Sequence, residues 1–124
     1  MNQKVNYNLI SNPLKLILDE RLRQMGEEGY SLEFDLINNP NGELANAAAV
    51  YSIDPMGGDA SNIVKTLWPW SRSQLKIKCN GNTIDCIDGR IRDLSRAGAL
   101  IMAELSRLLE IKKLRREKSD HLFK

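Results

Sequence analysis

The chain has 124 residues, of which 42% are hydrophobic but only 6% are aromatic. This length favours one domain, and a core poor in Phe and Trp must be made from Leu, Ile and Ala in close helix–helix contact. Eighteen basic residues against sixteen acidic ones do not give the charge typical of a nucleic-acid binder. We therefore expect a single domain over residues 1–124, of mainly α class, with three main helices and one short β-hairpin.

Two features of the chain bear on its cellular location. The start, MNQKVNYNLISNP, lacks the apolar segment of a signal peptide, and no apolar run approaches the roughly 20 residues of a membrane span. Cys79 and Cys86 are too few for a disulfide framework. We expect a soluble, cytoplasmic protein without a membrane partner, in which both cysteines are small buried thiols.

The first predicted helix follows a flexible segment at residues 1–12. Pro13 suits the first position of a helix. Hydrophobic residues then recur at spacings of three and four over 14–25, which is the period of an amphipathic helix, and glycines end the pattern at 26–29. A loop is expected at 29–42, where Asn-Pro and Asn-Gly are turn signals.

A second helix is predicted from about Asn41 through the Ala-rich stretch to residue 52. Its stripe contains Ala47 and Ala48, which lack bulk and let another helix come close. A short helix at 61–67 precedes Trp68-Pro69-Trp70.

The hairpin is predicted at residues 75–87. The stretches LKIKC and TIDCI flank Asn80-Gly81, and Asn-Gly is the strongest two-residue hairpin signal. Pairing Leu75 with Cys86 gives one apolar face and one charged face, which is a self-consistent register.

The last helix is predicted from about residue 89 to about residue 118, followed by a frayed tail at 119–124. At about 1.5 Å per residue it is ~45 Å long, more than a globule of this size needs. We expect its C-terminal part to pack against another chain, in a homodimer or homotetramer that also uses the Ala- and Gly-rich helix faces. Its apolar seam comprises Ile91, Leu94, Gly98, Ile101, Leu105 and Leu108.

Few residues offer catalytic chemistry. The single histidine, His121, lies in the expected tail, which disfavours a His-based general base or zinc site. Acidic pairs three residues apart occur only in the hairpin and the tail, and Glu43 is followed three residues later by Asn46 rather than by a carboxylate. We therefore expect no catalytic residue, metal or cofactor, and a protein that is not an enzyme.

Two groups of residues could bind a ligand. Trp68 and Trp70 could stack on a base or simply cover the helices. Three arginines, Arg90, Arg92 and Arg96, lie at the start of the last helix, where they could hold a phosphate or form exposed salt bridges. The basic run at 112–118 is typical of a solvated helix end and does not favour nucleic acid.

Four segments resemble a group of small phage-encoded proteins. They are ERLRQ with EGYSLEFD (20–35), NGELANAAAVYS (41–52), LWPW (67–70) and GRIRDLSRAGALIMAELSRL (89–108). The group shows the blocks ERxRQ, NGELAxAAAxY, WPW and RRDLxKAGALIxAEIxRL in the same order. The resemblance covers about residues 19–108, and the chain departs from it at 75–87.

Part of this group is similar to phage sponge proteins, which sequester cyclic nucleotide or cyclic ADP-ribose signals of bacterial CBASS or Thoeris defence. The resemblance implies an oligomeric anti-defence protein in the host cytoplasm that binds a phosphorylated nucleotide without cleaving it. We expect Arg21, Arg90, Arg92 and Arg96 to contact phosphate. Tyr30, Trp68 or Trp70 would stack on the base, and Gln24 or Asn41 would recognise its polar edges. Two alternatives remain: a divergent MazG-like, Mg²⁺-dependent nucleotide pyrophosphohydrolase using Glu43 or Glu27, and a phage inhibitor that acts by protein–protein contact.

Overall fold

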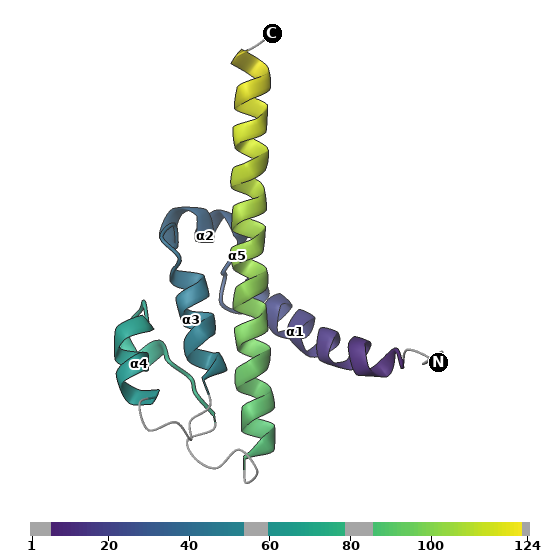
Figure 1. The fold of residues 1–124 in the computed structure, drawn as a ribbon, viewed down its shortest axis with the longest axis vertical. Helices are drawn as coiled ribbons and strands as arrows, with labels where there is room; N and C mark the ends of the chain where they lie inside the picture. Colours follow the sequence, from purple (N-terminus) through teal and green to yellow (C-terminus); the bar gives the residue numbers. More distant parts are fainter. Residues whose placement is uncertain (1–5, 54–59, 79–85, 123–124) are drawn as a thin grey trace, which may run out of the picture.

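The computed structural model describes residues 6–53, 60–78 and 86–122, and nearly all of the regular structure in them is α-helical (Figure 1). The predicted α class is confirmed. The elements in chain order are α1 (Asn8–Gly26), α2 (Leu32–Asn38), α3 (Glu43–Ser52), α4 (Ala60–Leu67), the 3-10 turn η1 (Arg72–Gln74) and α5 (Ile87–Leu122).

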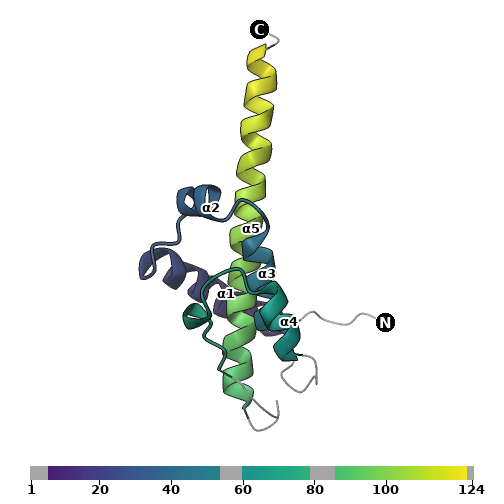
Figure 2. The ribbon, with the colours of Figure 1, turned by 90° about the vertical axis from the view of Figure 1, so that its left-hand side faces the viewer.

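The long helix α5 is the axis on which α1, α2 and α3 pack (Figures 1 and 2). α3 lies alongside it, α1 crosses it near its middle, and α4 packs on α3. The core between α3 and α5 is built mainly of small side chains, as predicted: Leu44, Ala47, Ala48, Tyr51, Ala97, Leu100 and Ala103. Small side chains allow the two helices to approach closely, and the tryptophans pack against the edge of this cluster.

Helix α1 begins earlier than predicted. The Oδ1 atom of Asn6 accepts a hydrogen bond from the backbone N–H of Asn8 (3.0 Å), and this contact satisfies one donor at the helix start. The helix therefore starts five residues before Pro13, which lies inside it. The expectation of a flexible segment at 1–12 is wrong for residues 8–12, while residues 1–5 lie outside the described part.

Helix α2 occupies the middle of the stretch predicted to be a loop. Ser31 caps it, because its Oγ accepts a hydrogen bond from the backbone N–H of Phe34 (3.2 Å). Glu33 and Asp35 lie in its first turn, where negative charge favours a helix. The turn signals around α2 are real: Gly42 has φ 86° at the start of α3, a conformation that suits glycine.

The predicted hairpin is not seen in the described residues. Residues 75–78 are not assigned to a strand, and the backbone N–H groups of Lys76 and Lys78 find side-chain acceptors instead. The backbone N–H of Lys76 donates to the hydroxyl of Tyr51 (3.0 Å), and that of Lys78 donates to Oδ1 of Asp93 (2.9 Å). This segment is therefore held by α3 and α5 and not by a pairing strand.

The ends of α5 also differ from prediction. The helix begins at Ile87, which was expected in the second strand, and residues 79–85 lie outside the described part. Cys86 is disulfide-bonded, so the prediction that it is a small buried thiol is wrong; Cys79 is among the residues not described. At the other end α5 continues to Leu122, and the tail expected to fray from residue 119 is helical to that point.

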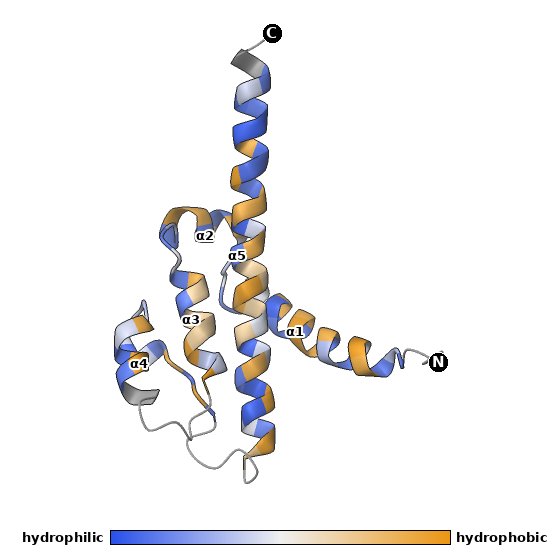
Figure 3. Cartoon of the chain, viewed as in Figure 1, coloured by the Kyte–Doolittle hydropathy of each residue, from blue (hydrophilic) through white to orange (hydrophobic). Residues whose placement is uncertain are grey.

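Most of the large aliphatic side chains of α1 and α5 do not face the core, with Leu100 as an exception on α5. Leu14 is 57% exposed and Leu105 is 54% exposed, whereas Glu20 and Arg96 are buried. In Figure 3 apolar segments recur along the part of α1 that projects from the molecule and along α5. None of the described helices is long and apolar enough to span a membrane.

Candidate functional site

A pocket of about 440 Å³ lies between α1, α2, α3, the segment 68–76 and α5. It brings together six of the nine predicted site residues: Arg21, Gln24, Tyr30, Trp68, Trp70 and Arg96. Its other aromatic, charged and amide-bearing lining residues are Phe34, Tyr51, Glu20, Arg23, Glu28, Asp35, Lys76, Asn38, Asn39 and Gln74. The pocket therefore combines aromatic surface with dense charge.

Helix α1 supplies the polar floor of the pocket. Glu20 and Gln24 are four residues apart and share a helix face, and Arg21 lies beside them. These three side chains are 3%, 5% and 5% exposed. The polar face of α1 thus packs inward against α5 and α2. Leu22, which lies between Arg21 and Gln24 in the sequence, points outward and is 57% exposed.

The carboxylate of Glu20 is surrounded by three arginines. Arg23 makes a two-point contact with it, from Nη2 to Oε1 (2.6 Å) and from Nε to Oε2 (3.0 Å). Nη1 of Arg92 lies 3.4 Å from Oε2, and Nε of Arg96 lies 3.8 Å from Oε1. Burial alone would raise the pKa of Glu20, but the hydrogen bonds from Arg23 and the three positive charges lower it below its ordinary value.

One ion pair and two hydrogen bonds link α1 to Trp70 through Asp35 and Asn39. Nη1 of Arg21 donates to the carbonyl of Tyr30 (3.1 Å), and its Nη2 lies 3.6 Å from Oδ2 of Asp35. Nδ2 of Asn39 donates to Oδ1 of Asp35 (3.0 Å), and Nε1 of Trp70 donates to Oδ1 of Asn39 (3.1 Å). Burial raises the pKa of Asp35, although Asn39 and Arg21 oppose the rise. These contacts fix the position of the Trp70 indole.

The two indoles both pack on the core and line the pocket. Trp68 meets Tyr51 edge to face, with ring centres 5.7 Å apart, and meets Trp70 in the same way at 5.3 Å. Nε1 of Trp68 donates to the carbonyl of Ser71 (3.0 Å). With both N–H groups engaged, the rings form a fixed aromatic wall.

Gln24 offers the pocket an open acceptor. Its Oε1 atom is buried and has no hydrogen-bond partner. A buried carbonyl without a partner costs about 1–3 kcal/mol, and a ligand that donates a hydrogen bond to it would remove this cost. The backbone of the same residue is engaged, because its carbonyl accepts from the N–H of Tyr30 (3.1 Å).

Arg90 and Asn41 lie outside the pocket lining. The guanidinium of Arg90 donates to the carbonyls of residues 51–53, with distances of 3.2 Å to Tyr51 and 3.0 Å to Ile53. These carbonyls end α3, so Arg90 caps that helix in the way that basic side chains do at helix C-termini. The backbone N–H of Asn41 donates to Oε1 of Glu43 (2.6 Å), and its side chain is exposed.

The other two predicted arginines differ in their relation to the pocket. Arg92 is not among the lining residues, and its side chain is 43% exposed beside Glu20. Arg96 lines the pocket, donates to the carbonyl of Lys76 and lies over the ring of Tyr51, 5.8 Å from the ring centre. Arg96 therefore already has several partners within the chain.

The carboxylates named for the pyrophosphohydrolase alternative are far from forming a cluster. Glu43 binds the backbone before α3, and Oε2 of Glu27 lies 3.7 Å from Nη1 of Arg23 on the surface. Within residues 6–53, 60–78 and 86–122, no group of three or more His, Cys, Asp or Glu side chains is placed to hold a metal ion.

Sequence reasoning missed several lining residues. Asp35 and Asn39 lay in the expected loop, although Ser31 followed by acidic residues is a recognisable helix start. Tyr51 belongs to the core cluster and lines the pocket as well. No sequence signal marked Lys76, because its position depends on the contacts that its backbone makes with Tyr51 and Arg96.

Similarity to known proteins gives no assignment for this pocket. Comparison of the chain with protein-family models, with curated proteins and with solved structures finds no match in any of the three. Function must therefore be inferred from the pocket residues themselves and from the sequence blocks described above.

Proposed function

We propose that the chain binds a small anionic nucleotide, of the cyclic nucleotide or cyclic ADP-ribose type, in this pocket and holds it without cleaving it. The observation that carries the proposal is an aromatic wall that shares one cavity with a buried open acceptor and with cationic side chains. The volume of about 440 Å³ falls within the range of roughly 300–1,000 Å³ that small-molecule sites occupy.

The aromatic wall suits a nucleobase. Stacking of a base on an aromatic side chain contributes roughly 1–3 kcal/mol, and the rings of Trp68 and Trp70 are held by hydrogen bonds and edge-to-face contacts. A rigid wall loses little entropy when a ligand binds. Oε1 of Gln24 would then accept a hydrogen bond from an amino or imino group of the base.

Lys76 suits the phosphate better than the arginines at the start of α5 do. Its ammonium group is exposed at the pocket and donates to the carbonyl of Ser73 (3.2 Å). In the part of the chain that the structure describes, no carboxylate lies within ion-pair distance of it, whereas Arg96 shares Glu20 with two other arginines. We therefore assign the first contact with phosphate to Lys76.

The carboxylates of the pocket floor favour binding over hydrolysis. Glu20 is held by Arg23, Arg92 and Arg96, and Asp35 by Arg21 and Asn39. A carboxylate engaged in this way acts as a counterion that holds the pocket together. A protein that binds a signal without consuming it lowers the free signal concentration, which is the sponge activity that the sequence blocks imply for a phage protein acting against host defence.

A ligand panel tests this proposal. The purified chain is mixed with cyclic dinucleotides and cyclic ADP-ribose isomers, its melting temperature is measured, and bound ligand is released by heat and identified by mass spectrometry. We expect a thermal shift with at least one member and recovery of one unaltered ligand per chain. No shift with any member, or recovery of a cleaved product, would contradict the proposal.

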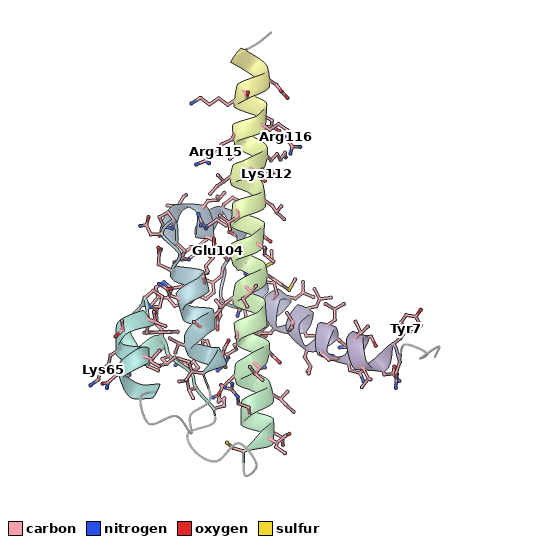
Figure 4. The ribbon with its side chains drawn as sticks, in the orientation of Figure 1. Tyr7, Lys65, Glu104, Lys112, Arg115 and Arg116 are labelled. Atoms are coloured by element: carbon pink, nitrogen blue, oxygen red, sulfur yellow. The ribbon has the colours of Figure 1, made fainter. Side chains whose placement is uncertain are left out.

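Two lysine variants make the panel specific to the pocket. Lys76→Ala removes the exposed cation without touching the backbone contacts of that residue, and we expect it to weaken ligand binding. Lys65→Ala removes an exposed lysine of α4, which Figure 4 shows projecting away from the rest of the molecule, and should leave binding unchanged. Equal effects of the two changes would mean that the lysine acts only through the net charge.

A further inference from the structure

Helix α5 carries most of its large aliphatic side chains on the face opposite to the core, apart from Leu100. Leu105 follows Arg96 by nine residues, which is two and a half helical turns, so the two point in opposite directions. Arg96 is 8% exposed and Leu105 is 54% exposed. We call the exposed row the α5 seam; it consists of Ile91, Leu94, Ile101, Leu105 and Leu108, all at least 44% exposed.

Helix α1 crosses this seam at Gly98. A Cβ atom added at Gly98 would lie 2.7 Å from Cγ1 and Cδ1 of Ile17, so the two helices touch there closely. From this crossing α1 runs away from α5 and projects from the molecule (Figures 1 and 4). We call the projecting apolar residues Leu9, Ile10 and Leu14 the α1 arm; they are 74%, 57% and 57% exposed.

The seam and the arm leave eight large apolar side chains exposed, five on the seam and three on the arm. A typical stable protein–protein interface buries about 800 Å² of each partner. The seam and the arm together supply the apolar part of such an interface.

We propose that a second copy of this chain covers the α5 seam, with the α1 arm of each copy lying on the seam of the other. Together with Gly98, the seam residues recur at alternating spacings of three and four, as in helices that bury one stripe against a partner helix. The contact of Ile17 with Gly98 shows that α1 and the seam already fit each other within one chain. A two-fold axis would satisfy both surfaces at once. The pocket contains Arg96, on the opposite face of α5, so this proposal is independent of the proposed function.

Size measurement on variants tests the proposal. Light scattering after gel filtration, with sedimentation over a concentration series, should give the wild-type chain a mass of twice 14.1 kDa or a larger multiple. Leu105→Glu on the seam and Leu14→Glu on the arm should each weaken assembly roughly tenfold or more, because each removes a leucine that the proposed assembly buries. Ser106→Glu and Asn12→Glu, at exposed polar neighbours, introduce the same charge and should assemble like the wild type.

Folding controls separate a loss of assembly from a loss of the fold. Circular dichroism and thermal unfolding identify any variant that has lost its fold; if Leu105→Glu is such a variant, Leu14→Glu decides, because the arm projects from the core. A wild-type chain that remains monomeric at every concentration would overturn the proposal, as would a monomer that binds anionic lipid vesicles through this face. Assembly that survives both leucine changes would also overturn it.

Discussion

Replacing Glu20 with glutamine removes the charge on which three arginines converge. Glu20→Gln keeps the size and shape of the side chain, so the change acts mainly through charge. Arg23 is 25% exposed and Arg92 is 43% exposed, so water can solvate both after the change. Arg96 is only 10% exposed at its side chain and would keep the carbonyl of Lys76 and the ring of Tyr51 as partners.

The magnitude follows from these exposures. Removing one partner of a buried ion pair costs about 3–5 kcal/mol of unfolding free energy, and we expect about 3 kcal/mol because two of the three arginines can reach solvent. Above pH 4.5, the ordinary pKa of Glu20, the carboxylate is charged in both states and its stabilising effect is complete. As pH falls below that value towards the lowered pKa of the folded state, the unfolded chain takes up the proton first and this stabilisation is lost.

Urea unfolding at several pH values measures this effect. The difference in unfolding free energy between wild type and Glu20→Gln should be largest at neutral pH and shrink as pH falls below about 4.5. The control is Glu28→Gln, which removes an exposed partner of the same Arg23 (2.9 Å) and should cost no more than about 1 kcal/mol. Equal costs for the two variants, or a difference that does not depend on pH, would refute the reasoning.

Three further predictions concern the pocket and the packing. Gln24→Met removes a buried carbonyl that has no partner, so the melting temperature should hold or rise while calorimetry shows weaker ligand binding; a lower melting temperature with unchanged affinity would make Gln24 structural. Ala48→Leu enlarges a side chain that is 2% exposed and should cost about 1–3 kcal/mol, whereas an unchanged urea midpoint would mean that the contact with α5 can expand. Ser31→Ala removes the cap of α2 and should cost about 1 kcal/mol, with increased amide exchange in α2; unchanged exchange would mean that packing on α5 alone holds α2.

Helices with local signals could be predicted from the sequence. The Ala-rich stretch and the Asn-Gly before it identify α3, and the short α4 and the long α5 follow from periodicity. The start of α1 could not be predicted, because it depends on a side-chain contact of Asn6. The hairpin prediction failed for the described residues 75–78 because Tyr51 and Asp93 hold the backbone of this segment. These contacts join residues far apart in the sequence, so no local pattern indicates them.

The orientation of α1 and α5 could not be predicted from their periodicity. An apolar stripe ordinarily faces the core of its own chain, but here the inward faces carry Glu20, Gln24 and Arg96. The sequence blocks nevertheless contain the six predicted site residues that line the pocket. Arg90 caps α3 and lies outside the pocket lining, and an arginine that caps a neighbouring helix has the same sequence pattern as one that binds phosphate.

Intrinsic tryptophan fluorescence tests the central claim most directly. The chain has two tryptophans, and both line the pocket, so all of the indole emission comes from the proposed base-stacking wall. Titration with the ligand that gives the largest thermal shift should change the emission saturably, at one ligand per chain, with free tryptophan as the control for absorption by the nucleotide. Emission that follows the free-tryptophan control with every member of the panel would contradict nucleotide binding in this pocket.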